Sequence, residues 1–266
     1  MSKIQSYIDN GLGVIILSDS ENGNRLDNNS LNEMKNVFDD YSGNKDVRVI
    51  LLRSNGNNFC LGMNLDTLIK SNGNAELVIG IDLYIDILKN IHSCHKPVVC
   101  AVNGDVKAGG VGLVSSCDII IASDKSSFEL SEALFGLIPA NVLPFIFSLR
   151  ITPQKARYLI LTAKKISAFE AKTINLVDEV FEQNMLEKGI KNVVKSLYRV
   201  SPDAVKYTKS FTTELLNLSF EESLVKAKNK LIELVETGDV NKAVAAFSQG
   251  DVPEWFSKFK PEKELI

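Results

Sequence analysis

Short apolar runs alternate with amphipathic stretches through the first half of the chain. The runs are rich in valine and isoleucine and are bounded by polar turns, which is typical of buried strands. Between them, apolar positions recur every three or four residues, as on one face of a helix. The predicted strands cover residues 4–8, 14–17, 47–52, 97–102 and 118–123, and the predicted helices cover 29–41, 75–91 and a short stretch that opens at 108–110. This order predicts a layered α/β core with right-handed crossovers.

The second half of the chain has a different pattern, dominated by helical periodicity. Ser167 and Glu170 form a predicted capping box at the start of one of these helices. The predicted helices cover residues 153–162, 167–174, 183–198, 203–215 and 219–237, with a short extended piece at 176–181. Because no repeat or low-complexity linker separates the halves, we expect a core over 1–195 and a C-terminal helical region over 196–266 that belongs to the same functional unit.

Composition narrows the class of protein. The chain has 266 residues, of which 45% are hydrophobic and 24% charged, with a net charge of -3. This is enough apolar material for a sizeable core and argues against disorder. The acidic balance, without a basic block, disfavours nucleic acid as a partner. No apolar run is long enough for a bilayer, and the N-terminus carries no secretory signal, so we expect a soluble cytoplasmic protein without a membrane partner.

Cysteine and histidine usage predicts no metal site. The four cysteines lack CxxC or zinc-like spacing, and Cys100 and Cys117 lie in apolar segments, where they are interpreted as buried reduced thiols. His92 and His95 flank Cys94, a trio that could ligate a metal but that has no carboxylates nearby, so a loop at a helix end is favoured. Catalysis by a histidine base is therefore not expected.

Two glycine-containing turns each follow a predicted buried strand. The first covers residues 59–65 and the second covers 103–110. Glycine allows close approach of the backbone to a ligand, so the two turns could bring two amide N–H groups onto one carbonyl oxygen as an oxyanion hole. On the pattern alone, ordinary strand-to-helix turns are the favoured interpretation. The G-x-G-x-x-G signature of dinucleotide binding is absent.

Two carboxylates lie three residues apart in an otherwise apolar segment. These are Glu129 and Glu132. A carboxylate in such surroundings has a raised pKa and can transfer protons near neutral pH. The alternative is an acid stabilised by a helix N-terminus without a catalytic role. The pattern alone leaves both interpretations open.

The order of several sequence blocks resembles the enoyl-CoA hydratase/isomerase (crotonase) superfamily. The blocks are Phe-x-x-Gly, Pro-Val-x-x-x-Val-Asn-Gly, Gly-Gly, Cys-Asp-Ile-Ile-Ile-Ala, Phe-x-x-x-Glu-x-x-x-Gly-x-x-Pro and Ile-Ser-Ala-x-Glu-Ala, and they cover about residues 5–247. The resemblance implies a crotonase-like α/β spiral of ββα units with a C-terminal helical trimerisation region. It also implies a homotrimer or a dimer of trimers, and an acyl thioester substrate without a further cofactor.

The resemblance assigns roles to individual positions. The oxyanion amides fall on Met63, which follows Gly62, and on Gly109, while the retained catalytic glutamate is Glu132. The second glutamate of the family is replaced by Gly112, which puts ordinary two-acid hydration in doubt. Asn64 stands where the family often has aspartate, and Gly110 follows the second oxyanion position.

Residues 107–112 and 127–145 look closest to one subgroup, the dehydratases of polyketide β-branching cassettes. The resemblance implies dehydration of 3-hydroxy-3-methylglutaryl groups on the phosphopantetheine of an acyl carrier protein. Residues 246–251 lack the Lys-Arg pair of many CoA-using relatives, which suits a carrier protein better than free CoA. Lys107 and Tyr84 are candidates for binding the distal carboxylate, and Asn141 could orient Glu132 or the substrate hydroxyl.

The expected activity is thus that of a hydro-lyase with one glutamate as acid and base. Three alternatives remain open. A Δ3,Δ2-enoyl thioester isomerase also needs only one glutamate, and a methylglutaconyl-ACP decarboxylase would belong to the same cassette. A non-catalytic trimeric scaffold would explain Gly112 but not the retained glutamate and turns.

Overall fold

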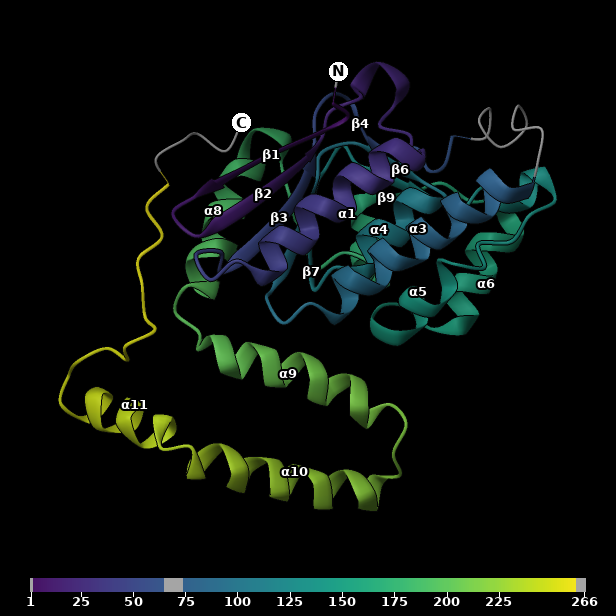
Figure 1. The fold of residues 1–266 in the computed structure, drawn as a ribbon. Helices are drawn as coiled ribbons and strands as arrows, with labels where there is room; N and C mark the ends of the chain where they lie inside the picture. Colours follow the sequence, from purple (N-terminus) through teal and green to yellow (C-terminus); the bar gives the residue numbers. More distant parts are fainter. Residues whose placement is uncertain (1, 65–73, 262–266) are drawn as a thin grey trace.

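The computed structural model describes residues 2–64 and 74–261. A six-stranded sheet has the order β1-β2-β3-β5-β7-β10, in which only the β1–β2 pair is antiparallel (Figure 1). Its strands are β1 (Ile4–Asp9), β2 (Leu12–Leu17), β3 (Val49–Ser54), β5 (Val98–Val102), β7 (Ile119–Ser123) and β10 (Glu179–Phe181). These strands agree closely with the sequence prediction, except that the hairpin turn is tighter. Asn10 and Gly11 both have positive φ, which is the two-residue turn that matches strand twist, so Leu12 already pairs in β2.

A smaller sheet has the order β4-β6-β8-β9. Its strands are β4 (Asn58–Cys60), β6 (Asp105–Lys107), β8 (Ser127–Glu129) and β9 (Ile166–Ser167). The chain passes from a strand of the large sheet to one of the small sheet and then into a helix. The three passes are β3-β4-α3 (α3, Asn74–Ser93), β5-β6-α4 (α4, Gly109–Ser116) and β7-β8-η2 (η2, Glu132–Phe135). This arrangement confirms the predicted spiral of ββα units.

The small sheet brings three turns together. Strands β4, β6 and β8 are parallel neighbours, so the residues that follow each of them emerge at the same edge. Ligands of parallel α/β structures bind at such carboxyl ends. Residues 61–64, 108–109 and 130–132 therefore meet, although they are far apart in the sequence.

Both faces of the large sheet are buried. One face packs on α1 (Asn28–Gly43), α3 and α4, and the other packs on α8 (Leu186–Leu197). Leu52 and Cys100 point to the first face, while their neighbours Leu51 and Val99 point to the second. Two-sided burial explains why these strands are continuous apolar runs rather than alternating patterns.

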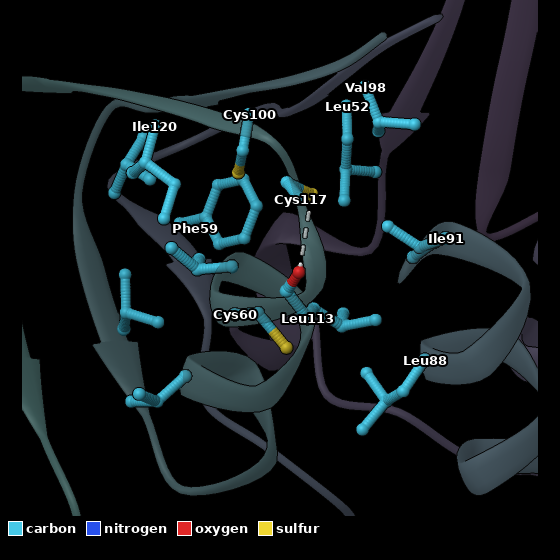
Figure 2. Packing of buried hydrophobic residues seen from close by; sticks show 14 of the residues in the cluster. Leu52, Phe59, Cys60, Leu88, Ile91, Val98, Cys100, Leu113, Cys117 and Ile120 are labelled. Atoms are coloured by element: carbon cyan, nitrogen blue, oxygen red, sulfur yellow. Dashed lines mark hydrogen bonds between the residues drawn. The ribbon is translucent and has the colours of Figure 1, made fainter. Parts of the chain in front are cut away.

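The core on the first face contains all four free cysteines, Cys60, Cys94, Cys100 and Cys117, as small apolar residues. Figure 2 shows Cys60, Cys100 and Cys117 among the side chains of this core. Burial raises the pKa of the Cys60 thiol to about 12, and the Cys117 thiol donates a hydrogen bond to the Leu113 carbonyl at 3.3 Å. The expected burial of Cys100 and Cys117 is confirmed.

The second half is helical, as predicted, and the capping box between Ser167 and Glu170 is present. The helices are α5 (Leu143–Leu149), α6 (Pro153–Thr162), α7 (Ala168–Thr173), α8, α9 (Pro202–Leu215), α10 (Phe220–Glu236) and α11 (Asp239–Ser248), with the short 3₁₀ turn η3 (Gln183–Met185), while the turn η1 (Ser20–Asn22) lies in the first half of the chain. Two of these, α5 and α11, were not predicted. Of the predicted extended piece 176–181, only β10 is a strand. Among the described residues, no helix is long and apolar enough to cross a membrane.

Helices α9, α10 and α11 leave the core after α8 (Figure 1). None of the residues in these three helices is buried within this chain. The chain then returns to the core, where Phe259 packs on the second face of the large sheet. The tail is also fixed by Arg48, whose guanidinium donates to the carbonyl of Trp255 at 2.8 Å.

Candidate active site

A cavity of about 1080 Å³ lies where the three turns meet. One wall consists of the turn after β4, the second of the turn after β6, and the third of the segment after β8, with α3 facing them. Most described residues assigned a role from sequence line it, namely Met63, Asn64, Tyr84, Lys107, Gly109, Glu132 and Asn141. A concave, mixed apolar and polar site of this size is suited to a small organic group.

The first wall presents the amide of Met63. The Leu26 amide donates to the Gly62 carbonyl at 2.9 Å, and the Asn64 amide donates to the Leu26 carbonyl at 2.8 Å. Since successive amides of an extended chain point in opposite directions, the Met63 N–H faces away from Leu26. No acceptor for it is found among the described residues. This N–H is available to a ligand in the cavity.

The second wall presents the amide of Gly109, the first residue of α4. Ala108 before it has φ 47° and ψ -120°, a conformation that costs energy for a residue with a side chain. Backbone hydrogen bonds hold Ala108 in this state: its N–H donates to the Glu129 carbonyl, and its carbonyl accepts from Val111, each at 2.9 Å. No acceptor for the Gly109 N–H is found in the described part of the chain, so this N–H is also available to a ligand.

The two amides lie next to each other because the turns touch. A Cβ on Gly62 would lie 3.1 Å from the Gly109 nitrogen and 3.1 Å from the Cβ of Ala108. Gly62 also has φ +85°, which favours glycine. The two N–H groups can therefore donate to one carbonyl oxygen, which is the arrangement of an oxyanion hole.

The third wall separates the roles of the two candidate acids. Glu129 ends β8 and forms an ion pair of 2.8 Å with Lys107 of β6. Glu132 lies beyond the strand, and its buried Oε2 has no hydrogen-bond partner among the described residues. Burial raises the pKa of Glu132, while the hydrogen bond from its own amide acts in the opposite direction. Glu132 is thus the carboxylate that is free to exchange a proton with a ligand.

Tyr84 fills the space beside Gly112. Its hydroxyl donates to the Gly109 carbonyl at 2.6 Å, and its side chain is 4% exposed. A Cβ on Gly112 would lie 2.1 Å from the same hydroxyl oxygen. Burial is the main cause that raises the pKa of Tyr84 well above its usual value, and the nearby Glu132 carboxylate acts in the same direction. The hydroxyl therefore stays protonated and stands where a side chain at position 112 would project.

Two of the predicted ligand-contacting glycines lie behind the cavity wall. Gly62 and Gly110 are not among the lining residues, and a Cβ on Gly110 would lie 2.3 Å from the Cys60 carbonyl. They allow the turns to pack closely. His92 belongs to the last turn of α3, and the described residues contain no cluster of three possible metal ligands.

Several lining residues were missed by the sequence interpretation. Leu77 and Ile81 of α3 lie seven and three residues before Tyr84, a helical spacing that could have identified them. Arg25 also lines the cavity, and its guanidinium donates to the Leu61 carbonyl at 3.2 Å. Its position depends on the long-range bridge between Leu26 and Met63, for which the sequence carries no local signal.

Comparison with known proteins gives matches along almost the whole chain. The sequence model of the family described as Enoyl-CoA hydratase/isomerase matches residues 7–258. The peroxisomal Delta(3,5)-Delta(2,4)-dienoyl-CoA isomerase of Arabidopsis thaliana is 28% identical over 259 residues, with 91% of this chain and 92% of the plant protein covered. The short-chain-enoyl-CoA hydratase of Clostridium acetobutylicum is 28% identical over 225 residues, covering 84% and 86%. The crystal structure of an enoyl-CoA hydratase from Bacillus anthracis superimposes with a TM-score of 0.86 at 25% identity, covering 96% and 99%.

Proposed function

Because this chain belongs to the enoyl-CoA hydratase/isomerase family, we propose that it dehydrates a 3-hydroxyacyl thioester with Glu132 as its single acid and base. Membership supports hydratase or isomerase chemistry on acyl thioesters. The use of a single acid and base is supported by one observation. The cavity combines two unengaged amides with one unpartnered carboxylate, while Tyr84 fills the space beside Gly112 where a second acid would project.

The reaction can be written with these groups alone. The thioester oxygen accepts hydrogen bonds from the amides of Met63 and Gly109. The Glu132 carboxylate removes a Cα proton, and the electron pair of that C–H bond moves into an enolate held by the two amides. When the enolate collapses, the bond to the β-hydroxyl breaks and the protonated Glu132 returns its proton to the leaving oxygen. Water departs, a carbon–carbon double bond forms and the carboxylate is regenerated.

One carboxylate suffices if the proton and the hydroxyl leave from the same face of the substrate. In a site with two acids, one carboxylate can remove the Cα proton while the other protonates the leaving hydroxyl. Here the isolated position of Glu132 requires a syn elimination. Removal of one oxyanion donor typically costs about 10²–10³ in kcat, so the two donors together are expected to contribute more than the proton transfer, which typically contributes about 10²–10⁴.

We propose 3-hydroxy-3-methylglutaryl on an acyl carrier protein as the substrate, and 3-methylglutaconyl as the product. The support is the resemblance of residues 107–112 and 127–145 to β-branching dehydratases, and the absence of a Lys-Arg pair at 246–251. Among the residues that the structure describes, Lys107 and Arg25 are the cations that line the cavity. Lys107 is already paired with Glu129, so a distal carboxylate would share that ammonium with it.

The second candidate is isomerisation of an enoyl thioester. It is favoured by the same single acid, since moving a proton between two carbons needs one shuttle, and by the Arabidopsis relative, which is named as a dienoyl-CoA isomerase. A decarboxylase and a non-catalytic scaffold complete the alternatives. The unpartnered state of Glu132 argues against the scaffold.

Assembly into a homotrimer or a dimer of trimers is also proposed. Large apolar side chains on α10 and α11 are exposed in the single chain, among them Phe220, Leu231 and Phe247. Exposed apolar surface of this extent is typical of protein interfaces. Sedimentation equilibrium would measure the state directly, and a monomer at micromolar concentration would contradict it.

Mass spectrometry of intact acyl carrier protein tests the reaction. The carrier is loaded with 3-hydroxy-3-methylglutaryl and incubated with wild type or with Glu132→Gln. The expected result is loss of one water with wild type and no change with the variant. Loss of carbon dioxide would indicate the decarboxylase. No mass change would contradict the dehydratase, and conversion of a Δ3-enoyl thioester to its conjugated isomer would then support the isomerase.

A further inference from the structure

We propose that Tyr84 is a positioning residue for the oxyanion hole, which it orients by anchoring the carbonyl of Gly109. The inference rests on the proposed function only in placing a thioester carbonyl between the Met63 and Gly109 amides. Tyr84 does not touch the reacting atoms in this arrangement. It acts through the backbone of the turn.

The turn after β6 needs restraint because Ala108 is strained. Ala108 connects β6 to α4 with positive φ, and relaxing it would rotate the peptide that carries the Gly109 N–H. Three hydrogen bonds oppose this rotation. Two are backbone bonds of Ala108 to Glu129 and Val111, and the third is the bond from the Tyr84 hydroxyl to the Gly109 carbonyl at 2.6 Å. Tyr84 is the side chain that completes this set.

The Tyr84 hydroxyl is itself confined. The side chain is buried, its oxygen would lie 3.4 Å from a Cβ on Gly109, and it uses the space that glycine leaves at position 112. Val142 closes the same space, since its Cγ2 would lie 3.1 Å from a Cβ on Gly112. A donor fixed in this way holds its acceptor without a large loss of side-chain freedom on ligand binding.

The position of the Tyr84 hydroxyl thus depends on glycine at position 112. A methyl group at position 112 must displace the hydroxyl, because the separation of 2.1 Å from its oxygen is far below van der Waals contact. Gly112→Ala is therefore expected to reproduce the loss of the hydrogen bond that Tyr84→Phe causes directly. In the double variant Tyr84→Phe with Gly112→Ala, the hydroxyl oxygen that the alanine would displace is absent. The effects of the two single substitutions should therefore not add.

The test uses polarisation of a bound carbonyl, which a purely structural role would not change. Butyryl-pantetheine labelled with ¹³C at its thioester carbonyl cannot lose water, and its ¹³C chemical shift reports hydrogen bonding to the oxygen. With wild type, we expect a downfield displacement on binding. Tyr84→Phe and Gly112→Ala should each lose most of it, and the double variant should lose no more than Gly112→Ala. The kcat of Tyr84→Phe should fall about 10- to 100-fold, with a smaller change in KM.

Tyr198→Phe is the matched control. Tyr198 is also buried and donates to a backbone carbonyl, that of Asn10, at 2.7 Å, but it packs on the other face of the large sheet. Tyr198→Phe should retain the full downfield displacement of the ¹³C chemical shift of the bound carbonyl. The proposal is overturned if Tyr84→Phe keeps the wild-type displacement, if Tyr198→Phe loses as much, or if wild type shows none. Absence of dehydration with the expected displacements would instead contradict only the proposed function.

Discussion

Lys107 and Glu129 are paired in register on the neighbouring strands β6 and β8, and their side chains form an ion pair of 2.8 Å in the cavity wall. The Glu129 side chain is only 13% exposed, so its charge is compensated within the site. Glu132, three residues further along, has no such partner. The same short segment therefore supplies one ion-paired carboxylate and one unpartnered carboxylate, and the roles proposed for the two can be tested.

Glu132→Gln should reduce kcat by about 10²–10⁴ while leaving substrate affinity nearly unchanged, because the amide keeps the shape but cannot transfer the proton. Steady-state kinetics on a 3-hydroxyacyl thioester provide the measurement. Glu129→Gln is the matched variant in the same wall. It loses an ion pair but no proton-transfer group, so its kcat should fall far less. Equal losses in both variants would contradict the assignment of roles.

The pH profile should show an acid limb above pH 4.5, the usual pKa of a glutamic acid. Burial raises the pKa of Glu132, and only the ionised form can remove the Cα proton in dehydration. Activity is therefore expected at higher pH and should disappear as the pH falls through the raised pKa. The limb is measured in kcat/KM, which reports the free enzyme. A profile flat down to pH 4.5 would show that Glu132 is not the base.

The order of motifs allowed much of this site to be predicted, because it resembles the enoyl-CoA hydratase/isomerase superfamily, and that resemblance assigned Met63, Gly109 and Glu132 to one site. The structure brings these residues together because β4, β6 and β8 are parallel neighbours and each motif follows one of them. The ion-pair and hydrogen-bond partners of the side chains in the site could not be predicted from the sequence. The Lys107–Glu129 pair depends on strand register, and the bond from Tyr84 to Gly109 depends on how α3 packs on α4. Such long-range contacts leave no local pattern.

The charge of the cavity wall should determine the preference for an anionic acyl group. Lys107→Met removes the ammonium and leaves Glu129 unpaired, so it should raise KM for 3-hydroxy-3-methylglutaryl more than for the uncharged 3-hydroxy-3-methylbutyryl thioester. Glu129→Gln frees the ammonium and should change the ratio in the opposite direction. The ratio of kcat/KM for the two substrates is measured in each variant. Parallel changes for both substrates would contradict recognition of a distal carboxylate by Lys107.

Gly62→Ala should impair both activity and stability. A Cβ there would lie 3.1 Å from the Gly109 nitrogen, and the backbone has φ +85°. Strain and crowding of this kind typically cost about 1–3 kcal/mol. Urea unfolding and kcat measure the two effects. Gly43→Ala is the control, since Gly43 lies in α1 with no atom within 4 Å of the added Cβ. It should be neutral or stabilising, and a similar cost at both positions would contradict the explanation.

Lys209 should be essential for the attachment of α9 to the core. Its ammonium donates to Asp118 Oδ2 at 2.6 Å and to the Lys96 carbonyl at 3.0 Å, while the same Asp118 oxygen accepts the Val98 amide at 2.7 Å. Burial raises the pKa of Asp118, and Lys209 opposes that shift. Lys209→Met leaves the Asp118 carboxylate, whose side chain is 20% exposed, without the ammonium that binds it. The cost should be below the roughly 3–5 kcal/mol that is typical when a fully buried ion pair is broken.

The double variant Lys209→Met with Asp118→Asn distinguishes this cause from a simple loss of packing. The asparagine can still accept the Val98 amide but carries no charge that needs a cation. It should therefore recover much of the free energy of unfolding that Lys209→Met loses, as measured by urea denaturation. If the double variant is less stable than Lys209→Met alone, the buried charge is not the reason that α9 needs Lys209. Kinetics of the double variant should remain close to wild type, because this contact lies outside the cavity lining.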